Sequence, residues 1–149
     1  REGYAVHDFF NPDRIIVGEV RGSEAIDMLQ ALNTGHDGSL STGHANSARD
    51  MLSRLETMIL MGMELPLAAV RRQIASGVDV IVHLGRLRDK SRRVMEITEI
   101  IGFADGEIVT KPVYQFAENG EEKGRVLGSL EKVGALTHTE KLFAAGEDV

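Results

Sequence analysis

The spacing of apolar residues changes near residue 78, and this change limits the fold more than any other feature of the sequence. Before it, short strand-like runs alternate with segments whose apolar residues recur at helical spacing, which is typical of an α/β unit with parallel strands. After it, strand-like runs follow one another with only turn sequences between them, at 78–87, 93–103, 107–116 and 124–130. Successive strands joined by short turns pair antiparallel. We therefore expect an α/β part, an antiparallel β-hairpin extension and a short C-terminal helix at 139–145.

Local signals place the elements of the α/β part. The β-branched run Ile15–Val17 predicts a strand buried on both faces, as in a parallel sheet. The small-residue run 38–44 predicts a second strand, against which a loop or ligand can come close. Three helices are expected, starting near Ser23, Ser47 and Pro66 and ending at Gly35, Gly62 and Gly77.

The charge and composition exclude several classes of protein. The sequence has no cysteine, which removes disulfide frameworks, thiolate zinc sites and cysteine nucleophiles, and favours a reducing cytoplasm. Its 17 Lys and Arg against 23 Asp and Glu give a net charge of -6, so we expect no nucleic acid partner. No apolar run approaches the ~18 residues of a membrane span, and the first residues do not resemble an export signal.

Two polar side chains follow the two expected strands. Glu19 comes directly after the first strand and Gly18, and His44 ends the second run. Ligands of open parallel sheets bind beyond the carboxyl ends of the strands. Glu19 is therefore placed to orient an attacking water or to hold a metal-bound one; the alternative is an ion pair with nearby Arg21. His44 is placed to donate to a phosphate oxygen; the alternative is a solvated side chain.

Metal and serine chemistry offer other interpretations of the same region. His36, Asp37 and His44 are possible metal ligands, but their spacing matches no standard zinc pattern and puts no two of them on one helical face. A serine hydrolase of the α/β type would need a G-x-S-x-G turn, which the sequence lacks. A metal-dependent hydrolase that uses these three residues stays open as an alternative.

The order of these pieces is more specific than any one of them. Residues 11–58, NPDRIIVGEVRGSEAIDMLQALNTGHDGSLSTGHANSARDMLSRLETM, resemble the C-terminal half of the RecA-like motor domain of type II/type IV secretion ATPases, most of all the CpaF-type ATPases of tight-adherence (Flp) pilus assembly. RIIVGEVRG resembles the Walker B element, and TGHDGSLSTGHANS resembles the histidine box. The likeness continues more loosely through GRLRDKSRRVMEITEI and GRVLGSLEKVG to TEKLFAAG, so it covers nearly all of residues 11–146.

The resemblance implies a fold, cofactors and residue roles. Residues 11–149 would form the C-terminal half of a RecA-like P-loop NTPase fold that works with ATP and Mg²⁺. Glu19 would be the Walker B acid, acting on Mg²⁺ through a coordinated water, and His44 would respond to the γ-phosphate. His36 would border the nucleotide and a neighbouring subunit. Further residues match recurring motif positions without a defined role: Arg21, Glu24, Thr42 and Arg54.

The resemblance also implies a setting for the intact protein. It would be a homo-oligomer, a hexamer, in the cytoplasm at the inner face of the cytoplasmic membrane. There it would associate peripherally with the platform proteins of a secretion or pilus system, and it would hydrolyse ATP to power export or pilus assembly.

The sequence departs from this family in two places. It contains no G-x-x-x-x-G-K-[S/T] loop, whose amides and lysine hold the β- and γ-phosphates, and which in the family lies upstream of residue 1. Residues 1–10, REGYAVHDFF, do not match, and we interpret them as a divergent or added lead. We therefore expect no ATPase activity from this chain alone. The rival interpretation is a non-catalytic module that docks on the ATPase ring through the basic hairpin Arg86–Arg93, which is otherwise a solvated turn.

Overall fold

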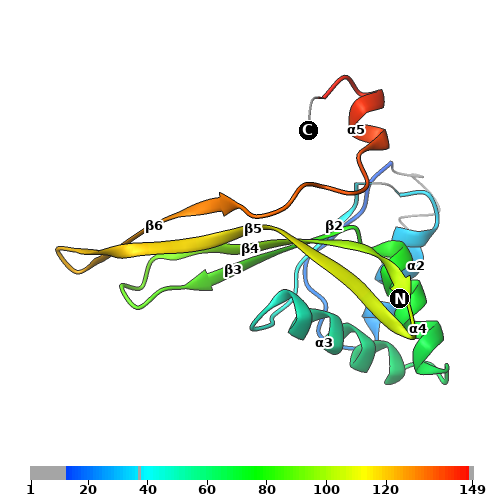
Figure 1. The fold of residues 1–149 in the computed structure, drawn as a ribbon. Coiled ribbons are helices and arrows are strands. Elements are labelled where there is room, and N and C mark those ends of the chain that lie inside the picture. Colours follow the sequence, from blue (N-terminus) through cyan, green and yellow to red (C-terminus); the bar gives the residue numbers. More distant parts are fainter. Residues whose placement is uncertain (1–12, 37, 148–149) are drawn as a thin grey trace.

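The chain folds into a helical α/β part and a projecting sheet (Figure 1). The computed structural model describes residues 13–36 and 38–147. Strands β1 (Ile16–Val17) and β2 (Leu40–Ser41) run parallel, and helix α2 (Glu24–Asn33) connects them. The predicted parallel crossover is therefore confirmed, although both strands are shorter than the predicted runs. The lead at residues 1–10 lies outside the described residues.

The first strand is not buried on both faces, so that prediction is wrong. Ile16 is 77% exposed and Leu40, its partner across the ladder, is 65% exposed, whereas Val17 packs against the core. Successive side chains of a strand point to opposite faces. The helices therefore cover the Val17 face, and no element in the described part of the chain covers the face that carries Ile16.

The helices α2, α3 (Ala48–Leu60) and α4 (Leu67–Gly77) enclose one aliphatic core. Its most completely buried large side chains are Ile59 of α3 and Val70 and Ile74 of α4, at 1%, 0% and 0% exposed. Each belongs to an apolar stripe at helical spacing, as the sequence predicted. Because aromatic residues are only 5% of the chain, branched aliphatic side chains and methionine fill this core.

The predicted helix caps are partly confirmed. The Ser47 side chain accepts a hydrogen bond from the Asp50 amide at 3.0 Å and caps α3 as expected. Pro66 directly precedes α4. The Ser23 side chain makes no cap hydrogen bond at α2. Instead, the carboxylate of Glu24 accepts hydrogen bonds from the backbone amides of Arg21 and Gly22, which fixes the loop between β1 and α2.

The remaining strands form one antiparallel sheet, as predicted. Its order is β3 (Val80–Arg86), β4 (Arg92–Ala104), β5 (Glu107–Glu122) and β6 (Arg125–Lys132). The last hairpin turn is shorter than the gap between the expected runs 107–116 and 124–130, because β5 continues through a register shift near Gly120 and reverses only at Lys123–Gly124. Both residues of this turn have positive φ, 50° and 74°, as a tight hairpin requires. Figure 1 shows the hairpin ends projecting beyond the helices.

Contacts with α4 and the core hold the sheet to the helical part. Ile100 of β4 belongs to the core cluster, and Ile81 and Ile108 pack against it. The guanidinium of Arg72 lies 5.2 Å from the centre of the Phe103 ring, a cation–π contact between α4 and β4. No helix in the described ranges is both long and apolar enough to cross a membrane.

A buried carboxylate holds the segment between β6 and the last helix, α5 (Glu140–Ala144), which lies within the predicted 139–145. Glu99 of β4 is 2% exposed and accepts the amides of Thr137 and His138, each at 2.8 Å. Burial raises the pKa of Glu99, but the hydrogen bonds from the His138 and Thr137 amides outweigh it, so the pKa lies below its ordinary value. The charged form of Glu99 therefore stabilises this segment.

Candidate functional site

Glu19 and His44 meet beyond the ends of the two parallel strands. Glu19 follows β1 and His44 follows β2, and since the strands are neighbours, the side chains that leave their carboxyl ends converge. Glu19 Oε1 lies 2.5 Å from His44 Nδ1. The Glu19 side chain is 24% exposed and that of His44 is 82% exposed. The structure thus brings together a half-buried acid and an open imidazole.

Arg21 holds the second oxygen of the same carboxylate. Its Nη2 lies 2.6 Å from Glu19 Oε2, and its side chain is 76% exposed. The Arg21 hydrogen bond, with a smaller contribution from His44, lowers the pKa of Glu19 despite partial burial. In turn, Glu19 raises the pKa of Arg21. The ion pair considered from the sequence is therefore present, and it coexists with the contact to His44.

Glu24 and Thr42 fix the backbone of the loop that carries Glu19 and Arg21. Glu24 Oε1 accepts the amides of Arg21 at 2.6 Å and Gly22 at 3.0 Å, and these bonds lower the pKa of Glu24. The Thr42 hydroxyl donates to the Gly18 carbonyl, and the Val20 amide donates to the Thr42 carbonyl at 2.9 Å. These contacts tie β2 to the loop after β1 on both sides of Glu19.

His36 and Arg54 lie in different surroundings. His36 is 7% exposed, and its Nδ1 lies 3.2 Å from the Ala31 carbonyl at the end of α2. Ser39 binds the His36 carbonyl and closes the turn, and the placement of His36 beside the nucleotide and a neighbouring subunit stays a prediction. Arg54 lies on the exposed side of α3.

The described residues contain no group of three His, Asp or Glu side chains that could hold a metal ion. Asp37 lies outside the described residues, so the metal set of His36, Asp37 and His44 stays a prediction without a test. His44 itself turns its Nδ1 toward Glu19.

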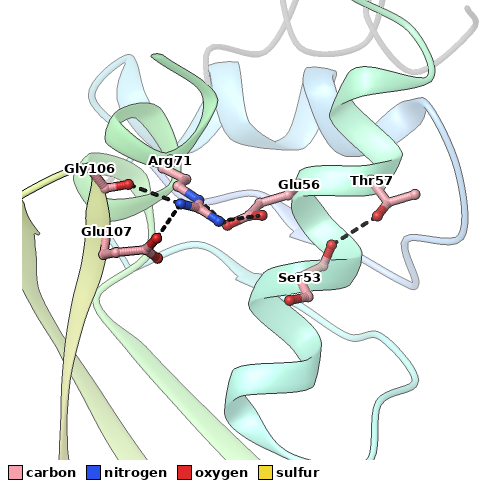
Figure 2. Close-up of polar contacts among 6 residues, drawn as sticks. All are labelled: Ser53, Glu56, Thr57, Arg71, Gly106 and Glu107. Atoms are coloured by element: carbon pink, nitrogen blue, oxygen red, sulfur yellow. Dashed lines mark hydrogen bonds and ion pairs between the residues drawn. The ribbon is translucent and has the colours of Figure 1, made fainter. Parts of the chain in front are cut away.

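Sequence reasoning missed an ion network that joins α3, α4 and the turn between β4 and β5 (Figure 2). Arg71 Nε donates to Glu56 Oε1 at 2.9 Å, and its Nη1 donates to Glu107 at 2.6 Å and to the Gly106 carbonyl at 3.0 Å. The side chains of Arg71 and Glu56 are 20% and 16% exposed. Hydrogen bonding to Glu56 raises the pKa of Arg71. No local pattern marks this network, because its members lie on three separate elements.

The basic hairpin between β3 and β4 is bound to the neighbouring hairpin. Arg88 pairs with Glu118 at 2.6 Å and with Glu121 at 2.9 Å, both on β5. Asp89 accepts the Val126 amide of β6 at 2.9 Å and the Ser91 hydroxyl at 2.6 Å. These bonds, that of Ser91 foremost, lower the pKa of Asp89 to about 2. These side-chain contacts join the two projecting hairpins in addition to the β4–β5 ladder.

The sequence of these elements matches a known family. Residues 10–135 match the model described as "Type II/IV secretion system protein", and the chain belongs to that family.

Particular relatives agree with this assignment. The chain is 43% identical over 103 residues to the putative conjugal transfer protein Rv3659c of Mycobacterium tuberculosis, covering 69% of this chain and 29% of that protein. It is 40% identical over 108 residues to the conjugal transfer protein TrbB of Rhizobium radiobacter, covering 72% of this chain and 32% of that protein. The chain thus spans about a third of the length of these relatives.

A solved structure shares the fold. The crystal structure of the VirB11 ATPase from the Brucella suis type IV secretion system, in complex with sulphate, is similar with a TM-score of 0.55 and 35% sequence identity. The similarity covers 58% of this chain and 27% of that one.

Proposed function

We propose that this chain is part of the nucleotide-hydrolysing motor of a secretion ATPase, in which Glu19 and His44 face the terminal phosphate of ATP. The observation that carries the proposal is the 2.5 Å contact between Glu19 Oε1 and His44 Nδ1 beyond the ends of two parallel strands. Ligands of open α/β sheets bind at such strand ends. The similar VirB11 protein is an ATPase in complex with sulphate, an anion that resembles phosphate in shape and charge.

The donor set fits Mg²⁺ through water. Mg²⁺ keeps several waters and binds through one or two carboxylates together with substrate phosphates. Glu19 offers one carboxylate, and its two oxygens already contact Arg21 and His44. A single carboxylate suits an outer contact, in which Glu19, once one of these partners leaves, accepts a hydrogen bond from a Mg²⁺-bound or attacking water. When bound, Mg²⁺ would supply charge neutralisation at the phosphates.

His44 links the phosphate to this acid. Its Nδ1 is engaged by Glu19, so Nε2 is the ring nitrogen that remains to reach a phosphate oxygen. As an imidazolium, His44 would donate to Glu19 and to the phosphate at the same time. Catalysis would then depend on positioning and on charge stabilisation, as is general in phosphoryl transfer.

The setting of this motor follows from the family. We infer a hexameric ring in the cytoplasm, at the inner face of the membrane, that moves the platform proteins of an export or pilus system. The relatives reported above are named for conjugal transfer and type IV secretion. The CpaF-like motifs add tight-adherence pilus assembly as the form of export that we propose for this sequence.

The proposal predicts different behaviour for the chain alone and for a completed motor. The chain alone should not turn over ATP, because its sequence has no G-x-x-x-x-G-K-[S/T] loop. Fusion to the upstream motor segment of a similar TrbB protein should produce Mg²⁺-dependent hydrolysis that Glu19→Gln abolishes. The matched control is Glu64→Gln, an exposed position between α3 and α4, which should keep the rate. Turnover that survives Glu19→Gln would contradict the proposal.

The structure gives less support to the rival docking module. One cation of the hairpin, Arg88, already pairs with Glu118 and Glu121, which leaves less positive charge for a partner. We therefore propose no second function. A pull-down with the intact ATPase can compare this chain with a variant whose charges at Arg86, Lys90 and Arg92 are reversed. Binding that is lost in the variant would support the docking module.

A further inference from the structure

Both oxygens of the Glu19 carboxylate are occupied in this structure. Oε1 contacts His44 at 2.5 Å, and Oε2 contacts Arg21 at 2.6 Å. A carboxylate oxygen that already contacts a guanidinium or an imidazole has less room to accept a hydrogen bond from water. The arrangement is therefore less suited to orienting an attacking water than a carboxylate with one oxygen free of such a partner.

Both partners of Glu19 are mostly exposed, Arg21 at 76% and His44 at 82%, and the guanidinium of Arg21 is the one that can give a phosphate two parallel hydrogen bonds. Ion pairs between exposed side chains contribute little to stability. A polyphosphate carries more charge than one carboxylate and accepts guanidinium hydrogen bonds in pairs. A polyphosphate would therefore compete with Glu19 for the Arg21 side chain.

The backbone of Arg21 is fixed while its side chain is exposed. Glu24 accepts the amides of Arg21 and Gly22 at 2.6 Å and 3.0 Å, so the loop cannot follow the side chain. Glu24 is thus a positioning residue. It holds the backbone of Arg21 in place beside Glu19.

We propose that Arg21 is an exchangeable counterion that holds Glu19 when no nucleotide is bound and transfers to a phosphate of the nucleotide, which releases Glu19 Oε2 for water. The inference rests on the proposed function, because it names the regulation of the same site. The ligand class is a nucleoside triphosphate, recognised here through its polyphosphate. This exchange makes the Glu19 carboxylate available to water only when a nucleotide phosphate is bound.

A titration of the chain with inorganic tripolyphosphate tests this exchange without requiring hydrolysis. NMR would follow the side-chain carboxyl carbon of Glu19 and the Nε–H group of Arg21. In the wild type, tens of millimolar tripolyphosphate should shift the Arg21 signal and raise the pKa of Glu19. In Arg21→Gln the pKa of Glu19 should already be raised, and tripolyphosphate should not change it. Arg92→Gln, the same change far out on β4, should respond as the wild type does.

A merely structural ion pair would give a different result. The Glu19 pKa would still rise in Arg21→Gln, but tripolyphosphate would leave Arg21 and Glu19 of the wild type unchanged, and that outcome overturns the inference. An equal response of Glu19 to tripolyphosphate in the wild type and in Arg21→Gln also overturns it.

Kinetics of the fused motor separate this inference from the proposed function. Arg21→Gln should raise the KM for ATP several-fold with a smaller change in kcat, and Arg21→Lys should recover part of the loss. Glu24→Ala should raise KM in the same direction, whereas Glu24→Gln, which keeps an acceptor oxygen, should do so less. If Glu19→Gln abolishes hydrolysis while Arg21→Gln leaves KM unchanged, the proposed function stands and the exchange is wrong. If hydrolysis does not depend on Glu19, the proposed function itself is wrong.

Discussion

Replacing Glu99 with glutamine removes the charge that holds the segment after β6 to the sheet. The native carboxylate is 2% exposed and accepts the amides of Thr137 and His138, each at 2.8 Å. Glutamine keeps one oxygen, which can still accept both amides as Glu99 Oε1 does at 3.0 Å from Thr137 and 2.8 Å from His138, but it sets an amino group against the Thr137 amide in place of the oxygen at 2.8 Å and removes the charge. Losing hydrogen bonds to a charged group and placing a buried donor against another donor cost about 1–3 kcal/mol. For a domain of this size, a loss of about 2 kcal/mol lowers Tm by roughly 4–8 °C.

The pH dependence of this effect has a definite sign. The folded state lowers the pKa of Glu99 below 4.5, so its charged form stabilises the fold fully above that pH and the contribution is lost as the pH falls through the folded pKa. The difference in Tm between wild type and Glu99→Gln should therefore be largest near neutral pH and shrink in acid. Thermal unfolding followed by circular dichroism measures it.

Hydrogen exchange identifies which part of the chain responds. The amides of Thr137 and His138 should lose protection in Glu99→Gln, while those of the α3 core should open only with global unfolding. Glu131→Gln, the same change at an exposed position of β6, is the matched control. Unchanged protection at Thr137 and His138, together with an unchanged Tm, would refute the reasoning.

Further predictions concern the core and the two ion networks. Ile59→Ala should lower the free energy of unfolding by about 2–5 kcal/mol, because the removed atoms leave a cavity at a side chain only 1% exposed; denaturant unfolding measures it. Arg71→Met and Glu56→Gln should each lower Tm. Because both changes break the same network, the Tm of the double variant should fall by less than the sum of the two single decreases. Decreases in Tm that add up would show that the two side chains are not coupled. Asp89→Asn should weaken the fold near neutral pH but not near pH 2, because the folded pKa of about 2 makes the charged form stabilising until the pH falls to that value; acid unfolding curves that stay parallel down to pH 2 would contradict this.

Local patterns predicted the elements well because local chemistry sets them. Ser47 and Asp50 are close in sequence, and their capping contacts need nothing from elsewhere in the chain. The antiparallel sheet followed from successive strands with short turns. The exposure of Ile16 could not be predicted in the same way, because it depends on what packs against a face of the sheet, and within the described ranges the face that carries Ile16 is open.

In the candidate site, too, contacts that follow from local sequence could be predicted, and contacts between distant residues could not. The meeting of Glu19 and His44 followed from their positions after parallel strands, and the ion pair with Arg21 from their closeness in sequence. The Arg71 network and the Glu99 anchor join residues that are 15 to 39 positions apart. Such pairs have no period or spacing that a sequence displays. Only the packing of α3, α4 and β4 brings them together.

A double-mutant cycle on ATP hydrolysis by the fused motor tests most directly whether Glu19 and His44 act together on one phosphate. The cycle compares kcat for wild type, Glu19→Gln, His44→Ala and the variant with both changes. If the two side chains work as one unit through their 2.5 Å contact, the double variant should be little slower than Glu19→Gln alone. Losses that multiply independently, or a His44→Ala motor as fast as the wild type, would contradict the account.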